Sequence, residues 1–119
     1  QEIKALSQLK EEFPFLLKII VETALLSEEE LITVTKIISD SRADFIKTST
    51  GFSVRGASLN DISLISQYKS NELKIKASGG IRTLESALAF IEAGVDRIGS
   101  SNAGTIVEEY RSRGGLLRR

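Results

Sequence analysis

The sequence predicts an α/β fold of four βα units, equivalent to half of a (β/α)8 barrel, and three observations lead to this prediction. Four short apolar runs, starting near residues 16, 43, 73 and 95, alternate with helical patterns, and this order is typical of a parallel sheet. Charged residues recur on one face of the predicted strands, which favours a barrel with a polar interior. A whole barrel needs about 250 residues, whereas this chain has 119 and four units.

Helical patterns occupy the segments between the apolar runs. The first covers residues 1–12, with apolar residues three apart, and ends at Pro14. The second begins at Ser27, where Glu30 completes a capping box. Further helices are expected over residues 58–68, from Thr83 to a stop at Gly94, and from Ser101 to near Arg113. The buried positions expected on these three middle helices include Leu31, Val34, Ile37, Ile38, Leu59, Ile62, Ile65, Leu84, Ala87, Leu88 and Ile91.

The predicted strands cover residues 15–21, 43–48, 73–77 and 95–99. Residues 43–49 resemble residues 95–101, and two hydroxyl residues follow the strand in each copy, which supports a repeated unit. No linker or low-complexity segment interrupts the pattern, so we expect residues 1–119 to form a single domain with no internal boundary.

The alternation of side chains along the strands distinguishes a barrel from a flavodoxin-like open sheet. Leu17, Ile19 and Val21 share one face of the first strand, while Lys18 and Glu22 share the other. The third strand repeats this pattern, with Leu73 and Ile75 opposite Lys74 and Lys76. An open sheet with helices on both faces would need two apolar faces, so the barrel is favoured and the open sheet is the weaker alternative.

The composition excludes several classes of chemistry. The chain contains no histidine and no cysteine, which excludes a Ser-His-Asp triad, a thiolate nucleophile, a disulfide and a zinc ribbon. Sixteen basic residues balance sixteen acidic ones, so no global field favours nucleic acid or a membrane surface. No apolar run reaches the ~20 residues of a membrane span. We therefore expect a cytoplasmic protein with no nucleic-acid or membrane partner, and the missing initial methionine suggests a piece of a longer chain.

Two lysines stand at the ends of neighbouring predicted strands. Lys47 and Lys76 each precede a loop of small and hydroxyl residues. The carboxyl ends of parallel strands are where α/β folds place their sites. Two adjacent ammonium groups lower the pKa of at least one of them, and a neutral lysine can attack a carbonyl to form a Schiff base. The sequence therefore indicates amine catalysis, although solvated strand-end lysines are the alternative.

Two loops before helices fit phosphate binding. One contains Gly79 and Gly80, and the other contains Gly99, Ser100 and Ser101. Free backbone N–H groups at a helix start bind phosphate, and barrels commonly place a phosphate at the loops after their last two strands. Tight turns without a ligand remain the alternative. Glu22 is expected to be a structural partner of Lys74 or Lys18, although it could orient a lysine or a water.

Three motifs together resemble deoxyribose-phosphate aldolase, and residues 17–23 also look like the fifth strand of that family. The motifs are Ala43-Asp44-Phe45-Ile46-Lys47-Thr48-Ser49-Thr50-Gly51-Phe52, Lys74-Ile75-Lys76-Ala77-Ser78-Gly79-Gly80-Ile81-Arg82-Thr83 and Arg97-Ile98-Gly99-Ser100-Ser101. The resemblance runs from about Leu6 to Tyr110. It implies the C-terminal half of a (β/α)8 class I aldolase, a lyase of deoxynucleotide catabolism that reversibly cleaves 2-deoxy-D-ribose 5-phosphate to D-glyceraldehyde 3-phosphate and acetaldehyde.

The resemblance also implies roles for individual residues. Lys47 resembles the Schiff-base lysine, and Lys76 resembles the second lysine of the family, which perturbs the first and serves as a proton donor and acceptor. The positions near the substrate phosphate are Gly51, Gly79, Gly80, Gly99, Ser100 and Ser101. No metal or organic cofactor is implied.

The family's features that precede this chain leave a second interpretation of its function open. The family's catalytic aspartate and first four strands precede Gln1 in the alignment of motifs, so the barrel has two open edges. We therefore expect a homo-oligomer or a pairing with the missing N-terminal half. The alternative to an aldolase is a catalytically incomplete half barrel that self-associates and at most binds phosphate.

Overall fold

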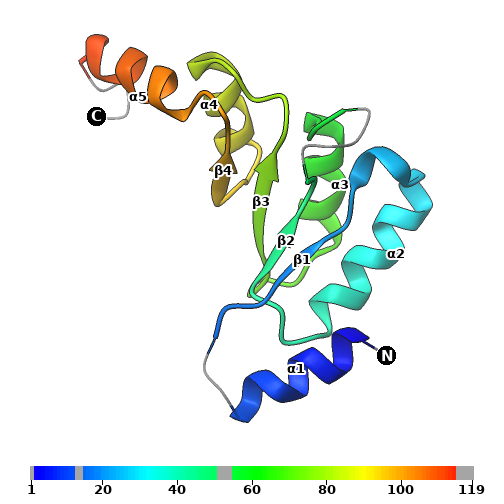
Figure 1. Cartoon of the computed structure of the whole chain (residues 1–119). Helices are drawn as coiled ribbons and strands as arrows, with labels where there is room; N and C mark the ends of the chain where they lie inside the picture. The colour runs from blue at the N-terminus through cyan, green and yellow to red at the C-terminus, as the bar shows by residue number, and fades with distance from the viewer. Residues whose placement is uncertain (1, 13–14, 51–54, 115–119) are drawn as a thin grey trace.

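A computed structural model describes residues 2–12, 15–50 and 55–114, and these form a four-stranded parallel sheet with helices between the strands (Figure 1). The strand order is β1-β2-β3-β4, so each strand pairs with the next one in the sequence. The elements in chain order are α1 (Glu2–Glu12), β1 (Lys18–Ile20), η1 (Thr23–Leu25), α2 (Glu28–Ser39), β2 (Phe45–Lys47), α3 (Leu59–Tyr68), β3 (Lys74–Ser78), α4 (Leu84–Glu92), β4 (Arg97–Gly99) and α5 (Ala103–Ser112).

The two faces of the sheet differ as the charge pattern predicts. On the outer face, Ile46 and Ile75 are fully buried and belong to one apolar cluster with Ile38 of α2 and Ile62 of α3. On the inner face none of the described helices covers the charged residues, and Lys18, Lys74 and Arg97 are exposed to solvent. The chain is therefore a partial barrel, and the open-sheet alternative is wrong.

Most element boundaries follow from local signals in the sequence. Ser27 and Glu30 form the predicted capping box at the start of α2, with hydrogen bonds of 2.9 and 3.1 Å. Thr83 caps α4, and Gly94 follows its end with a φ of 113°. The strands β1, β2 and β4 are shorter than predicted. Three apolar residues expected in the buried stripes are exposed instead: Ile37 at 41%, Leu59 at 49% and Ile91 at 46%.

Two aspartates hold the amino-terminal edge of the sheet in the same way. Asp44 accepts a hydrogen bond of 2.8 Å from the backbone N–H of Leu17, and Asp96 accepts one of 2.9 Å from the N–H of Ile75. Each aspartate thus ties its own strand to the preceding neighbour in the sheet. Asp44 also pairs with Lys10 of α1 at 2.7 Å. The resemblance between residues 43–49 and 95–101 therefore reflects a repeated structural contact, and both aspartates have a structural role at this edge.

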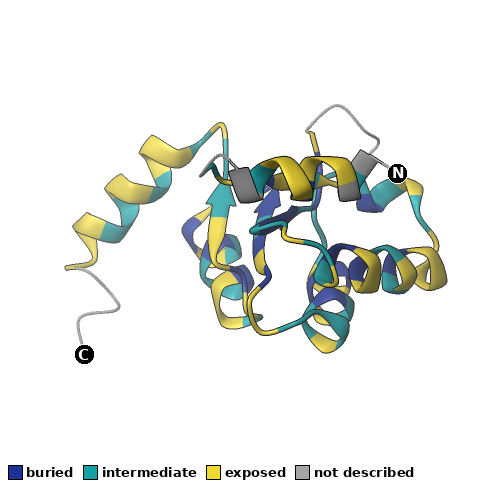
Figure 2. Ribbon diagram, turned by 90° about the horizontal axis from the view of Figure 1, so that it is seen from below, coloured by how far each residue is buried: buried dark blue, intermediate teal, exposed yellow. Residues whose placement is uncertain are grey.

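The last helix lies to one side of the sheet. α5 packs on α4 and contains no buried residue, and in Figure 2 its surface is largely exposed. Pro14, at which the sequence predicts the end of the first helix, and residues 115–119 lie outside the described residues. None of the helices in the described segments is both long enough and apolar enough to cross a membrane.

Candidate active site

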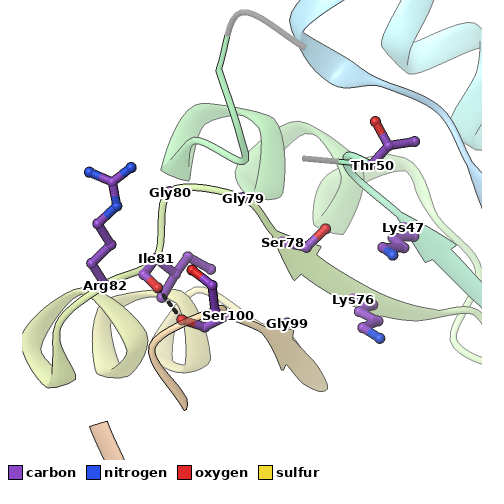
Figure 3. Close-up of a pocket in the computed structure, with 11 residues that line it drawn as sticks. Lys47, Thr50, Lys76, Ser78, Gly79, Gly80, Ile81, Arg82, Gly99 and Ser100 are labelled. Carbon is purple, nitrogen blue, oxygen red and sulfur yellow. Dashed lines mark hydrogen bonds between the residues drawn. The ribbon is translucent and has the colours of Figure 1, made fainter. Parts of the chain in front are cut away.

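The sheet register brings Lys47 and Lys76 together. Lys47 of β2 and Lys76 of β3 are direct partners in adjacent parallel strands, so their side chains leave the same face at the same level. In Figure 3 the two lysines lie beside each other on neighbouring strands. They border a pocket of about 390 Å³ at the carboxyl ends of the strands. The residues that line it are Lys47, Thr50, Lys76, Ser78, Gly79, Gly80, Ile81, Arg82, Gly99, Ser100 and Ser101.

This pocket contains seven of the eight predicted site residues. Both lysines, the two glycines after β3 and the Gly99–Ser101 segment line the same space. Gly51, the eighth, lies outside the described residues. The structure shows that these residues lie close together around one pocket, and the functional roles that the sequence predicts for them stay predictions.

Lys76 has an altered electrostatic environment. Burial lowers the pKa of Lys76 below the ordinary value of 10.5, and the positive charges of Lys18, Lys47 and Arg97 lower it further. Gly99 lies against this lysine, because a Cβ at Gly99 would be 3.4 Å from Cε of Lys76. The lowered pKa makes loss of a proton from Lys76 easier than from a solvated lysine.

Glu22 contacts a different residue from the one expected. Its carboxylate accepts a 3.0 Å hydrogen bond from the backbone N–H of Thr50 and a further bond from the Thr50 hydroxyl. These bonds lower the pKa of Glu22, with a smaller contribution from the charge of Lys47. The φ of Glu22 is 51°, in the left-handed region that is uncommon for a residue other than glycine. The expected pairing with Lys74 or Lys18 is therefore wrong, and Glu22 holds the segment that follows Lys47.

The turn after β3 depends on close backbone packing. Gly79 and Gly80 have φ values of 84° and 76°, which glycine adopts without steric cost. Gly56 lies directly against this turn, since a Cβ on Gly56 would come 2.0 Å from the carbonyl oxygen of Gly79. Below the turn, Ser78 donates a 2.7 Å hydrogen bond to the carbonyl of Ser49. The loops after β2 and β3 are thus fastened to each other at the wall of the pocket.

Ser100 connects the loops after β3 and β4. Its hydroxyl donates to the carbonyl of Ile81, as the dashed line in Figure 3 shows, and accepts a 3.0 Å bond from the N–H of Asn102. Ser101 is exposed. Asn102 precedes α5 and makes no side-chain cap to that helix. Backbone N–H groups at a helix start that lack a side-chain cap are suited to an anion.

A buried aspartate anchors the loop that follows Lys47. Asp61 accepts hydrogen bonds from the Thr23 hydroxyl at 2.8 Å, from Nη1 of Arg55 at 2.7 Å and from the N–H of Ser58 at 3.2 Å. Burial raises the pKa of Asp61, but the bonds from Arg55, Thr23 and Ser58 outweigh it and hold the pKa below the ordinary value of 3.8. The segments after β1 and β2 are therefore joined through the start of α3.

Sequence reasoning did not identify several of these residues as part of the site. The positive charges of Lys18 and Arg97 lower the pKa of Lys76, although neither residue lines the pocket. The signal that could have found them is the sheet register, because Arg97 is the direct partner of Lys76 on β4 and Lys18 stands on the same face of β1. No sequence motif indicates the pairing of Arg55 with Asp61.

Comparisons with known proteins agree on one family. No family model matches the chain. The chain is 54% identical over 93 residues to a deoxyribose-phosphate aldolase of Mycoplasma pneumoniae, covering 78% of this chain and 42% of that protein. It is 51% identical over 96 residues to the enzyme of that name from Aquifex aeolicus, covering 81% of this chain and 44% of that protein. The chain thus spans less than half the length of the curated relatives it matches.

Solved structures give the same result for the fold. A structure titled "QR15, an Aldolase" superposes with a TM-score of 0.87 and 45% identity, over 98% of this chain and 53% of that one. A deoxyribose phosphate aldolase from Aeropyrum pernix, described as having a unique tetrameric structure, gives 0.82 and 28%, over 94% and 48% of the two chains. The four βα units therefore match about half of these aldolase structures.

Proposed function

We propose that this chain carries the amine and phosphate sites of a class I aldolase. The proposal is supported by the similarity of most of the chain to about half of a deoxyribose-phosphate aldolase. The proposed reaction is the reversible cleavage of 2-deoxy-D-ribose 5-phosphate to D-glyceraldehyde 3-phosphate and acetaldehyde. The observation that supports it most is the direct pairing of Lys47 with Lys76 at one pocket with the glycine loops. Full activity needs the part of the barrel that this chain does not contain, and a cytoplasmic location is proposed with it.

The proposed chemistry uses Lys47 as the nucleophile. The neutral amine attacks the aldehyde carbon, water leaves, and the resulting iminium withdraws electrons from the neighbouring carbon. A base removes the proton of the sugar hydroxyl, the carbon–carbon bond breaks, and D-glyceraldehyde 3-phosphate departs. The enamine that remains takes up a proton, and water releases acetaldehyde and restores the amine. Lys76, with its lowered pKa, is the proposed proton donor and acceptor beside Lys47.

The phosphate of the substrate is proposed to lie between the loops after β3 and β4. Gly79 and Gly80 line the pocket, and Arg82 adds a positive charge to its lining. The uncapped start of α5 adds further N–H groups near Ser100 and Ser101.

Trapping with borohydride tests the proposal on the chain itself. The protein is incubated with acetaldehyde and borohydride at neutral pH, and the modified lysines are identified by peptide mapping. We expect Lys47 to be ethylated faster than Lys36, which lies on the helical surface. Lys47→Arg should remove the fast site, whereas Lys36→Arg should leave it unchanged. Equal labelling of Lys47 and Lys36 would contradict the proposal.

The second candidate is a catalytically incomplete half barrel that self-associates and at most binds phosphate. The observation that favours it is the open sheet, because β1 and β4 each pair on one side only among the described strands. This candidate predicts binding of inorganic phosphate without selective labelling of Lys47. The same labelling experiment, with phosphate binding measured by calorimetry in parallel, therefore distinguishes the two candidates.

A further inference from the structure

The backbone just after β1 contains a residue in an unusual conformation. Glu22 has a φ of 51°, and it is the one residue other than glycine with a positive φ in the described part of the chain. The residue before it donates its N–H to the carbonyl of Lys47 at 3.0 Å, and the residue after it donates to the carbonyl of Thr48 at 2.9 Å. Backbone strain of this kind persists only where the surroundings enforce it, and it is concentrated at functional sites.

This conformation directs the carboxylate of Glu22 toward Thr50. One carboxylate oxygen accepts a 3.0 Å hydrogen bond from the backbone N–H of Thr50, and the other accepts a bond from the Thr50 hydroxyl. A single carboxylate therefore fixes both the backbone and the side-chain torsion of this threonine. Thr50 lines the pocket and Glu22 does not, so Glu22 can influence a bound molecule through Thr50.

The bonds from Glu22 complete the fixation of the segment that follows Lys47. Thr48 and Ser49 are fully buried and are hydrogen-bonded to β3. Thr50 is exposed, and in Figure 3 it lies at the same wall of the pocket as Lys47. Packing holds the two buried residues in place, whereas the carboxylate of Glu22 holds the exposed residue that comes after them.

The strain at position 22 favours a role for the side chain at the pocket. Glycine adopts a φ of 51° without steric cost, so a residue needed for the backbone alone would be better replaced by glycine. The bonds from Thr50 lower the pKa of Glu22 below its ordinary value of 4.5, so the carboxylate is charged at neutral pH. Hydrogen bonds to a charged acceptor are stronger than those to a neutral one.

We propose that Glu22 is a positioning residue of the pocket, which holds Thr50 where a carbonyl compound that fills the pocket meets the wall beside Lys47. Acetaldehyde has only two carbons and can react with the amine without contacting that wall. A sugar phosphate fills more of the pocket and contacts Thr50. Glu22 has this role only if Lys47 is the reactive amine, so the proposal rests on the proposed function.

The test compares two carbonyl compounds at the same lysine. Lys47 is trapped with borohydride and either 2-deoxy-D-ribose 5-phosphate or acetaldehyde, and peptide mapping gives the ratio of the two labelling rates. A misplacement of about 1 Å can cost about a hundredfold in rate, so we expect this ratio to fall at least about tenfold in Glu22→Ala and in Glu22→Gly. Glu29→Ala, at an exposed position in the first turn of α2, is the matched control and should keep the ratio.

Urea unfolding of the same variants separates positioning from stability. Glu22→Gly removes the backbone strain that Glu22→Ala retains, so the glycine variant should unfold at the higher urea concentration although both lose the same share of the labelling ratio. Glu22→Gln covers the case in which these variants do not fold, since it keeps the length of the side chain and lacks the charge. It should lower the ratio in the same direction by a smaller factor.

The outcomes distinguish this proposal from the proposed function. A ratio that no variant at position 22 changes, or one that recovers in Glu22→Gly together with stability, would overturn the positioning role alone. If acetaldehyde labels Lys47 of the unaltered chain no faster than Lys36, the proposed function fails, and the role of Glu22 fails with it.

Discussion

Lys76 differs from the lysines of the helix surfaces in what surrounds its ammonium group. Burial and three neighbouring cations lower its pKa, and Arg97 is the neighbour directly opposite it on β4. We expect Arg97→Gln to raise the pKa of Lys76 toward 10.5, because one repelling charge is removed. An NMR titration of the Lys76 Cε signal measures this change. Arg111→Gln on α5 serves as the control and should leave the titration as it is.

The same shift makes stability depend on pH. Because the pKa of Lys76 is lowered in the folded state, the unfolded chain binds more protons between the folded pKa and 10.5. The charged form therefore destabilises the fold at neutral pH, and this cost disappears as the pH rises through that interval. Urea unfolding should show Lys76→Met gaining stability relative to the unaltered chain near pH 7, with the advantage shrinking toward pH 10.5. An advantage that does not change with pH would contradict this explanation.

Asp61 is expected to contribute most of its stabilisation as a charged group. Asp61→Asn removes the charge that Arg55 pairs with at 2.7 Å in a buried position, so we expect a loss of about 1–3 kcal/mol in urea unfolding. Since the pKa of Asp61 is lowered, its stabilisation is present above 3.8 and is lost as the pH falls through the folded value. Asp40→Asn, at the exposed end of α2, is the matched control and should change stability little.

Residues of the site were predictable where local sequence fixes their place in the backbone. Lys47 and Lys76 follow apolar strands and precede glycine-containing loops, so alternation along the strand placed both on the inner face. Glu22 was misassigned because its left-handed backbone turns the carboxylate toward Thr50, and no residue pattern announces that conformation. Arg97 lies beside Lys76 because of the register between β3 and β4, and the sequence of one strand alone does not determine that register.

The starts of α2, α3 and α4 were predictable because each of these helices carries its own start signal. Ser27, Ser58 and Thr83 cap the helices that follow them, so their starts agree with the sequence pattern. Strand lengths were overestimated because apolar runs continue past the last ladder pair. Ile91 is exposed because it borders the groove beside α5 instead of an enclosed core.

The loop between β2 and α3 depends on one glycine that packs against another. A methyl group at Gly56 would lie 2.0 Å from the carbonyl oxygen of Gly79, so the two loops would have to separate. We expect Gly56→Ala to cost about 1–3 kcal/mol in urea unfolding and to weaken binding of inorganic phosphate. Gly104→Ala is the matched control, because its added methyl meets nothing within 4 Å and helix propensity favours alanine by about 1 kcal/mol. Equal effects of the two substitutions would show that the contact between the loops is unimportant.

At the scale of the whole molecule, the described residues form a parallel sheet that is covered by helices on one face and open on the other. The outer face of the sheet is buried beneath α2, α3 and α4, whereas the inner face carries five cations and opens to solvent. Length and charge alternation predicted this partial barrel from the sequence.

The central claim is that the lysine pair and the phosphate loops form one site. The most direct test compares borohydride trapping at Lys47 by 2-deoxy-D-ribose 5-phosphate with trapping by unphosphorylated 2-deoxy-D-ribose. A hydrogen bond to a charged group contributes about 1.5–3 kcal/mol, so we predict labelling of Lys47 at least about tenfold faster with the phosphorylated sugar. Inorganic phosphate should suppress that advantage. Equal labelling by the two sugars, or labelling spread over surface lysines such as Lys36, would contradict the account.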